Sequence, residues 1–310
     1  MPTVLITGGT GTIGKRLTAL LLQKGYSVNI LSREKKQSSN PKLHYYQWDI
    51  NNQTIEQEAV QSANFIIHLA GAGVADKRWT ATRKNEIKQS RINSCMLIVD
   101  TLLHTPNKVE AIVSASAIGW YGPDSPDTIK HGFNETDPVY PDFLGETCKG
   151  WEDSIAPVVS MGKRLVILRT GIVLSNDGGA LVEFKMPLKF KLATILGNGK
   201  QMISWIHIDD LCNQYIFAIE NPAMHGVYNA VAPSPVCNKE LIITLAKRIC
   251  GKYFMPFYVP SFLLKIVLGE MSIEVLKSTT VSAQKIINQG FYFEYPLINN
   301  AIISLTTRKL

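Results

Sequence analysis

The chain has 310 residues, of which 45% are hydrophobic and 18% charged. This length and apolar content exclude a mini-protein and a disordered chain, and they allow one large α/β domain or a domain with an appendage. No run of about 18 uncharged apolar residues is present, and the first residues lack the basic leader and cleavage site of a secretory signal. We therefore expect a cytoplasmic protein without a membrane partner.

The formal net charge of +7 admits an anionic partner. Lys and Arg divide evenly, with 16 in residues 1–150 and 16 in the rest, so a phosphate-bearing small ligand explains the charge as well as nucleic acid does. The five cysteines form no C-x-x-C pair and have no histidine at zinc-ligand spacing. The sequence therefore predicts reduced thiols and no metal site.

Short apolar runs with the length of buried strands alternate with helical stretches over the first 170 residues. The first of these helices covers Lys15–Lys24, where leucines recur on one face, and Gly25 is its expected end. Strands separated by helices of ten residues or more form right-handed crossovers and a parallel sheet covered on both faces. The predicted fold is a doubly wound α/β sheet with strands at Val4–Thr7, Val28–Leu31, Leu43–Trp48, Phe65–Leu69, Ala111–Ala115 and Leu165–Arg169.

After about Thr170 the pattern changes to glycine-rich turns and a proline cluster, followed by a mostly helical tail. We interpret this part as a smaller α+β substrate lobe. The expected division is a dinucleotide-binding domain of residues 1–172 plus 206–232 and a lobe of residues 173–205 plus 233–310.

The glycine-rich segment Thr7–Gly14 is the most specific feature of the sequence. Gly8, Gly11 and Gly14 form a G-x-x-G-x-x-G turn between the first strand and the first helix. In such a turn the first glycine permits the bend, the second lets the backbone approach a pyrophosphate, and the third allows close packing of helix and strand. The turn predicts dinucleotide binding.

The end of the second strand bears on the choice between NAD and NADP. An acidic residue about 20 positions after the turn would bind a free ribose hydroxyl, but here the chain has Ser32-Arg33. Arg33 can bind a 2′-phosphate that an aspartate would repel, which favours NADP over NAD. A solvated loop arginine next to Glu34 is the alternative.

Several motifs follow the strands in a fixed order, among them Asp49-Ile50, His68–Gly71, Ser114–Ser116 and Leu168–Gly171. With the glycine turn, they make the sequence resemble the extended short-chain dehydrogenase/reductase superfamily over nearly its whole length. The turn and the second strand offer cofactor contacts at Gly8, Thr10, Gly11, Thr12, Ile13, Gly14, Ser32 and Arg33, and the resemblance adds Asp49, Ile50, Leu69, Ala70, Gly71, Ser114, Arg169 and Gly171.

Within that superfamily the chain resembles a branch labelled sugar-nucleotide epimerase-like. The matching segments are Ala75–Trp79, Phe143–Glu146, Ser204–His207, Pro235–Glu240 and a C-terminal helical module that contains Gly269-Glu270-Met271.

The superfamily's chemistry uses a tyrosine and a lysine one helical turn apart, so that the ammonium assists proton exchange by the phenol. None of the 11 tyrosines has a lysine four positions later. Alignment on Trp151-Glu152 places the pair at Leu144 and Cys148, which carry neither function.

Three residues remain as candidate catalytic groups. Ser116 is at the position of the helper serine, Glu146 is next to the lost pair, and Tyr121 follows on the next loop. Their structural alternatives are a serine bonded to local backbone, a solvent-facing glutamate and an aromatic packed against the second lobe.

The segment Lys77–Arg91 has six basic residues against one acid, Glu86. A solvated basic helix is the commoner outcome, and no nucleic-acid module accompanies it, so we expect no nucleic-acid partner. Arg78 and Arg91 are candidates for contacts with cofactor or substrate.

The sequence leaves two functions open. The first is an NADP-dependent oxidoreductase or epimerase for a small hydroxylated or carbonyl substrate, including nucleotide-sugar-like compounds. The second is a protein that senses or scaffolds through bound NADP without chemistry.

Overall fold

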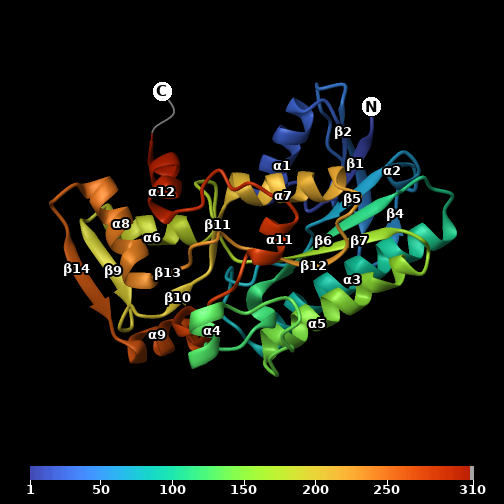
Figure 1. The fold of residues 1–310 in the computed structure, drawn as a ribbon. Coiled ribbons are helices and arrows are strands. Elements are labelled where there is room, and N and C mark those ends of the chain that lie inside the picture. Colours follow the sequence, from blue (N-terminus) through green and yellow to red (C-terminus); the bar gives the residue numbers. More distant parts are fainter. Residues whose placement is uncertain (308–310) are drawn as a thin grey trace.

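An eight-stranded sheet forms the centre of the molecule in the computed structural model, which describes residues 1–307 (Figure 1). The strand order is β12-β7-β6-β5-β1-β2-β3-β4, and every neighbouring pair is parallel except β3 with β4. The strands are β1 Thr3–Thr7, β2 Ser27–Ser32, β3 Leu43–Asp49, β4 Thr54–Ile55, β5 Phe65–His68, β6 Ala111–Ala117, β7 Arg164–Thr170 and β12 Gly226–Ala230.

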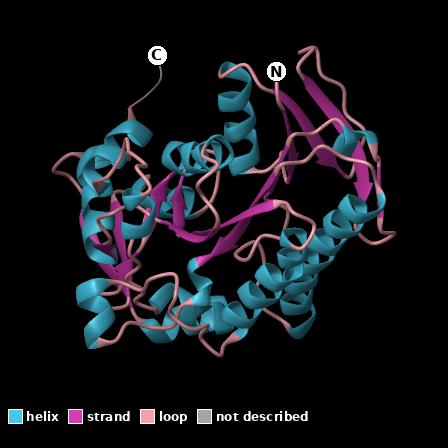
Figure 2. Cartoon of the chain, turned by 45° about the vertical axis from the view of Figure 1, so that its right-hand side comes forward, coloured by secondary structure: helices cyan, strands magenta, loops and turns pink. Residues whose placement is uncertain are grey.

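Helices cover both faces of this sheet, as Figure 2 shows. Successive side chains of β1 point to opposite faces of the sheet and pack into two cores. Val4 and Ile6 are buried in one apolar cluster and Leu5 in the other. The first cluster includes α1 (Thr12–Gln23) and α7 (Ile208–Glu220), and the second includes α3 (Ala81–His104), α5 (Phe143–Ile155) and the short α2 (Glu58–Gln61). The predicted doubly wound α/β fold is confirmed.

The remaining chain forms a smaller lobe with its own apolar core, in which Leu181, Ile195, Leu241 and Ile302 are buried together. Three two-stranded sheets lie outside the main sheet: β8 with β11, β9 with β14, and β10 with β13. The strands are β8 Ile172–Leu174, β9 Leu192–Leu196, β10 Met202–Ile203, β11 Trp205–His207, β13 Val236–Cys237 and β14 Met255–Val259. The remaining α-helices of the described chain are α4 Pro126–His131, α6 Ala180–Leu188, α8 Asn238–Cys250, α9 Ser261–Leu268, α10 Ser272–Leu276, α11 Gln284–Asn288 and α12 Ile298–Thr306, and of these α6, α8 and α12 form the lobe core.

The packing differs from the expected domain division in one segment. The sequence assigns residues 233–310 to the small lobe, but Val281, Ile286, Phe291 and Phe293 are buried in the core beneath the main sheet. The chain thus leaves the lobe at about residue 278, packs along α7 and β12 through α11, and returns to the lobe with α12. Periodicity alone could not show which of two cores an apolar run would join.

None of the helices within residues 1–307 is long and apolar enough to span a bilayer.

Candidate functional site

The glycine turn lies where the strand order changes direction, between β1 and β5. Strands β2 and β3 follow β1 on one side, whereas the chain crosses over to β5 and β6 on the other. The loops that follow β1 and β5 therefore run to opposite sides and leave a crevice between the carboxyl ends of these strands. Doubly wound sheets bind their ligands in such a crevice.

Two glycines of the turn are required by its geometry. Gly8 has a φ of +69°, and a Cβ built there would lie 3.0 Å from the carbonyl of Leu69 at the end of β5. A Cβ on Gly14 would run into the backbone of Gly8 and Gly9, so this glycine lets α1 pack directly on the turn. Gly11 is exposed, and a Cβ there would meet only the Gly8 carbonyl oxygen, at 3.4 Å.

The turn presents free hydrogen-bond donors to this crevice. Helix α1 begins at Thr12 after Gly11, which has no side chain to cap it. Within the described chain no acceptor takes the backbone N–H of Thr12, Ile13 or Gly14. Free amides and the positive end of the helix dipole suit a pyrophosphate, so the residues present fit the dinucleotide that the turn predicts.

The loop Leu69–Gly71 is held against the turn by a buried polar network. Thr7 Oγ1 accepts the backbone N–H groups of Leu69 and Ala70, each at 3.1 Å, and donates its proton to His68 Nδ1 at 2.8 Å. His68 Nε2 then donates to Ser94 Oγ at 3.2 Å, because Ser94 gives its own proton to a backbone carbonyl. Complete burial lowers the pKa of His68 to about 3, which keeps the ring neutral. The network fixes the second wall of the crevice.

At the end of β2 the two predicted cofactor residues differ in their freedom. Ser32 is buried, and its hydroxyl is bonded to the backbone of Glu34, which closes the turn. Arg33 is exposed, and its guanidinium contacts no acceptor among residues 1–307. At the end of β3, hydrogen bonds from Asn52 and Asn51 lower the pKa of the Asp49 carboxyl, so this side chain closes its own turn.

Leu144 and Cys148 occupy the face of α5 that meets the end of β6. A Cβ on Gly119 would lie 3.0 Å from Leu144 Cβ, and Cys148 Sγ lies 3.5 Å from the carbonyl oxygen of Ala117. Burial raises the pKa of the Cys148 thiol to about 12, so it is no substitute for a lysine. The sequence alignment of these two positions agrees with their place in the fold.

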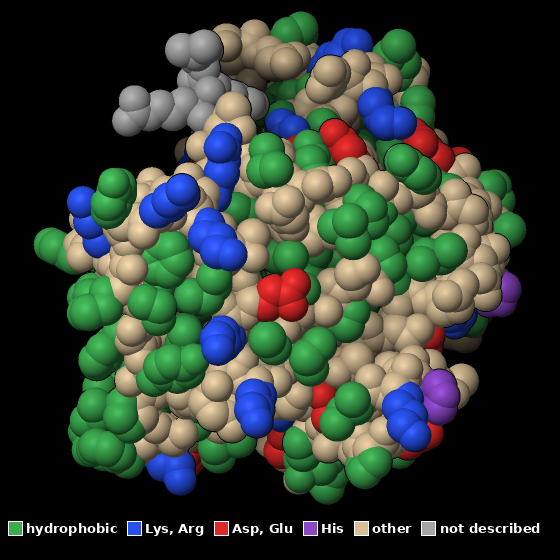
Figure 3. All heavy atoms as spheres, turned by 60° about the vertical axis from the view of Figure 1, so that its left-hand side comes forward, with side chains coloured by type: hydrophobic (Ala, Val, Ile, Leu, Met, Phe, Trp, Pro, Cys, Tyr) green, Lys and Arg blue, Asp and Glu red, His purple; other side chains and the backbone are tan. Residues whose placement is uncertain are grey.

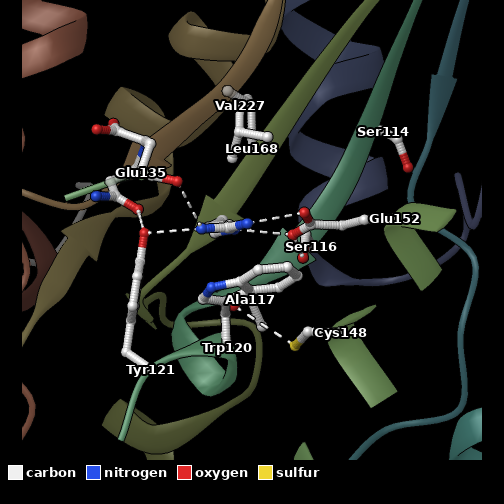
Figure 4. Close-up of polar contacts among 12 residues, drawn as sticks. Ser114, Ser116, Ala117, Trp120, Tyr121, Glu135, Cys148, Glu152, Leu168 and Val227 are labelled. Carbon is white, nitrogen blue, oxygen red and sulfur yellow. Dashed lines mark hydrogen bonds and ion pairs between the residues drawn. The ribbon is translucent and has the colours of Figure 1, made fainter. Parts of the chain in front are cut away.

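A buried network centred on Arg169 fills the region beside this face, and Figure 4 shows it around Glu152, Ser116 and Tyr121. Arg169 donates two hydrogen bonds of 2.9 Å to the carboxylate of Glu152, one of 3.1 Å to Tyr121 Oη and one of 3.3 Å to the Glu135 carbonyl. Its guanidinium also lies 3.6 Å from the centre of the Trp120 ring.

Burial in and around this network bears on three of the predictions. Arg169 and Ser114 are 2% and 1% exposed, so their side chains do not face the open crevice, and a cofactor contact at either residue would have to come from its backbone. Tyr121 is fully buried, and its hydroxyl donates to Asn229 Oδ1 at 2.7 Å, so it is not a catalytic acid facing substrate. Desolvation also raises the pKa of Tyr121 far above its ordinary value.

The other two catalytic candidates, Glu146 and Ser116, lie in different surroundings. Glu146 is exposed on the side of α5 opposite Cys148, so it does not lie on the face that the tyrosine and lysine would have occupied. Ser116 is at the predicted strand end, but it is 2% exposed and donates its only proton to Glu152 at 2.6 Å. It therefore cannot donate to a substrate carbonyl while this bond exists. Lys149 is a surface residue paired with Asp153.

The second lobe reaches the glycine turn directly. Its Asp177–Gly179 loop precedes α6, and Thr12 Oγ1 donates to the Asp177 carbonyl at 3.4 Å. A Cβ on Gly178 would lie 2.8 Å from the same hydroxyl. Gly171 allows a second close approach of the two parts of the chain, since a Cβ there would lie 2.5 Å from the Ser204 carbonyl. The lobe thus borders the site where the pyrophosphate is expected.

Two arginines of the basic segment hold the loop after β5. Arg83 and Arg91 are 7% and 9% exposed, and their guanidinium groups donate to the carbonyls of Gly73 and Ala72. They are therefore not available to a nucleic acid, and Arg91 does not contact the crevice as proposed from the sequence. Arg78 is exposed beside Gly269.

Sequence reasoning missed Thr7 and His68 as supports of the site. Both residues are in the quoted motifs, and a threonine and a histidine ending neighbouring strands are the signal that could have paired them. Glu152 was used only as an alignment marker, although a carboxylate on the inner face of a helix requires a buried partner.

Comparisons with known proteins agree with this geometry. Residues 4–149 match the model of the NAD dependent epimerase/dehydratase family, and residues 259–305 match a domain of unknown function, DUF1731. An epimerase family protein of Staphylococcus haemolyticus is 38% identical over 95% of this chain and 96% of its own length. One from Bacillus subtilis is 33% identical over 97% of each chain.

Solved structures show the same fold. The human epimerase family protein SDR39U1, isoform 2, solved with NADPH, has a TM-score of 0.83 at 27% identity and covers 98% of each chain. MoeE5, solved with UDP-glucuronic acid and NAD, has a TM-score of 0.78 at 20% identity over 99% of this chain and 100% of its own. Together with the free amides of the glycine turn, these matches show that the chain belongs to the epimerase family proteins, NAD(P)-binding members of the extended short-chain dehydrogenase/reductase class.

Proposed function

We propose that the protein is an NADP(H)-dependent oxidoreductase acting on a small carbonyl or hydroxylated substrate. The observation that carries the proposal is the exposed guanidinium of Arg33 beside a glycine turn with free amides. The Asp177–Gly179 loop of the second lobe borders the same turn, so a substrate bound between lobe and cofactor would face the sheet's carboxyl edge.

The preference for NADP rests on charge. Arg33 directly follows β2, at the position where an aspartate would select NAD, and it has no carboxylate partner within residues 1–307. Its planar guanidinium can bind a 2′-phosphate in a bidentate manner. The human relative was solved with NADPH and MoeE5 with NAD, so the family fold accommodates both cofactors.

The chemistry proposed for this site lacks a tyrosine acid. Bound NADP(H) supplies or accepts a hydride at its nicotinamide ring. Leu144 and Cys148 offer no proton at the usual place, and the hydroxyl of Ser116 donates its hydrogen bond to Glu152. We infer that Ser116 acts as a positioning residue and that the proton comes from water or from the substrate. This favours reduction over epimerisation, because oxidation of an alcohol needs a base for its hydroxyl proton.

Titration of the protein with NADPH and with NADH tests the cofactor. Arg33→Ala should weaken NADPH binding by about 10- to 100-fold and leave NADH binding nearly unchanged, since hydrogen bonds to charged groups contribute about 1.5–3 kcal/mol. Lys35→Ala is the matched control, because this exposed lysine is paired with Glu56. Equal weakening of both cofactors by Arg33→Ala would overturn the 2′-phosphate assignment.

The reaction is tested by following NADPH oxidation with a panel of carbonyl compounds and nucleotide sugars. The positioning role of Ser116 is supported if the Ser116→Ala variant shows lower turnover than the intact protein and binds NADPH with the same affinity. Binding of NADPH with no turnover in any class would overturn the oxidoreductase proposal.

The second candidate function is NADP(H) sensing without catalysis. This function is favoured by Leu144 and Cys148, which carry no catalytic group. It is also favoured because the polar groups around Arg169 bond to one another. A sensor would change its binding to a partner when NADPH is added, and oxidation of NADPH at a catalytic rate by any metabolite would exclude it.

A further inference from the structure

The edge of the small lobe carries a continuous run of exposed apolar side chains over β14 and α9. In α9 only Leu264 is buried, whereas Phe262, Ile266 and Val267 are 62%, 65% and 69% exposed. In β14, Met255 and Phe257 are 58% and 48% exposed. We call β14, α9 and the adjoining Phe190, which is 79% exposed, the lobe patch.

These parts are joined in space as well as in sequence. Strand β14 leads into α9 through Pro260, and β14 pairs only with β9. The N–H of Met255 donates to the Lys191 carbonyl, which brings the turn that holds Phe190 to the start of β14. Figure 3 looks onto this side of the molecule and shows hydrophobic side chains gathered beside Lys and Arg, with Asp and Glu sparse among them.

The two chain segments that form the lobe patch contain no acidic residue, although Glu183, Glu240 and Glu270 flank them. Residues 184–208 and 241–269 contain four Lys or Arg each and no Asp or Glu. Removing these eight cations from the total of 32 leaves 24 Lys and Arg against 25 Asp and Glu, so the net charge of +7 resides in these two segments. None of the eight forms an ion pair within residues 1–307.

We propose that the lobe patch docks the protein on an anionic phospholipid bilayer, with the apolar side chains in the headgroup region and the unpaired lysines on lipid phosphates. Amphipathic surfaces that bind membranes in their plane combine these two features. A second copy of this chain is a poorer occupant, because a two-fold interface would bring the same cations together with no carboxylate between them.

This proposal departs from the sequence-based expectation of no membrane partner. That expectation rested on the absence of a spanning segment, and an interfacial patch needs none. It is independent of the proposed function, because none of its residues borders the glycine turn.

Co-sedimentation with lipid vesicles tests the apolar part. The intact protein should sediment with vesicles of phosphatidylglycerol and phosphatidylcholine in equal parts, and not with phosphatidylcholine alone. Phe262→Asp/Ile266→Asp should weaken this binding at least tenfold. Met96→Asp/Leu103→Asp is the matched control, with side chains 54% and 62% exposed on α3, and it should bind as the intact protein does.

The charged part is tested in the same assay. Lys252→Glu/Lys265→Glu should weaken vesicle binding by about tenfold or more, since each lysine near an anionic surface contributes on the order of a fivefold gain. Lys42→Glu/Lys108→Glu, with the same charge change on the main domain, should have a clearly smaller effect. Affinity for NADPH should be the same in all four variants, which shows that each is folded.

Four results would overturn the proposal. They are failure to sediment with anionic vesicles, equal sedimentation with neutral vesicles, equal loss in the control variants, and a dimer in light scattering that Phe262→Asp/Ile266→Asp converts to monomer. Saturable binding to an acidic protein that persists without lipid, together with no vesicle binding, would assign the patch to a protein partner instead.

Discussion

Replacement of Arg169 by methionine tests whether this residue stabilises the fold or contacts the cofactor. Its side chain is 3% exposed and that of Glu152 is 9% exposed, and two hydrogen bonds of 2.9 Å join them. Arg169→Met leaves a buried carboxylate whose remaining donor is Ser116, and it also removes donors from Tyr121 Oη and the Glu135 carbonyl.

Breaking a buried ion pair by removing one partner costs about 3–5 kcal/mol. The individual contacts give a similar figure, because each buried acceptor left without a donor costs roughly 1–3 kcal/mol. We therefore expect Arg169→Met to lower the free energy of unfolding by about 3 kcal/mol or more. Arg169→Met/Glu152→Met should recover part of this loss, since no unpaired charge then remains in the core.

Urea unfolding followed by circular dichroism measures the loss, and titration with NADPH under folding conditions measures cofactor binding. Lys149→Met is the control, because Lys149 is on the same helix as Glu152, and its substitution removes only an exposed pair with Asp153, which should cost less than about 1 kcal/mol. If Arg169→Met lowers the free energy of unfolding by less than about 1 kcal/mol while NADPH binding weakens strongly, Arg169 contacts the cofactor and the structural assignment is wrong.

Three further predictions concern the crevice. Gly14→Val should abolish NADPH binding, because its Cβ would collide with the Gly8 and Gly9 backbone; retained affinity in titration would contradict the close packing of α1. Thr7→Val should lower the free energy of unfolding by about 2 kcal/mol and weaken NADPH binding, because the Ala70 N–H loses its acceptor and His68 Nδ1 loses its donor, while the Leu69 N–H keeps the Thr7 carbonyl. Since burial lowers the pKa of His68 from 6.5 to about 3, the unfolded chain binds a proton that the folded chain refuses, and stability is lost as the pH falls through this interval. His68→Asn should make that loss shallower by up to about 1.4 kcal/mol per pH unit, and unchanged slopes in urea unfolding at pH 7 and pH 4.5 would refute it.

The sheet and the glycine turn could be predicted because their signals are local. The runs Val4–Thr7 and Val28–Leu31 are apolar except for Thr7 and Asn29, as expected of strands buried on both faces, and the turn between the first strand and helix has one geometry that fits its glycines. The six expected strands all lie in the observed sheet, within two residues at each end.

The direction of side chains could not be predicted in the same way. Arg169 lies near the carboxyl end of β7 and Ser114 in the middle of β6, but whether such a side chain enters the crevice or the core depends on partners far away in sequence. Glu152 is 17 residues before Arg169, and Asn229 is 108 residues after Tyr121. A buried ion pair of this kind leaves no periodic signal in the sequence, since each charged residue taken alone is expected on the surface.

The loss of the tyrosine and lysine is therefore more than the absence of two groups. Leu144 packs against Gly119 and Cys148 contacts the Ala117 carbonyl, so apolar atoms fill the face that the pair would have occupied. The neighbouring polar atoms bond to one another: the Ser116 hydroxyl donates to Glu152, and the guanidinium of Arg169 donates to three partners. Under the proposed oxidoreductase function, a site built in this way would place a substrate against the nicotinamide without a tyrosine or lysine proton at that point. It would then suit substrates whose reduced form is stable as an anion or takes its proton from water.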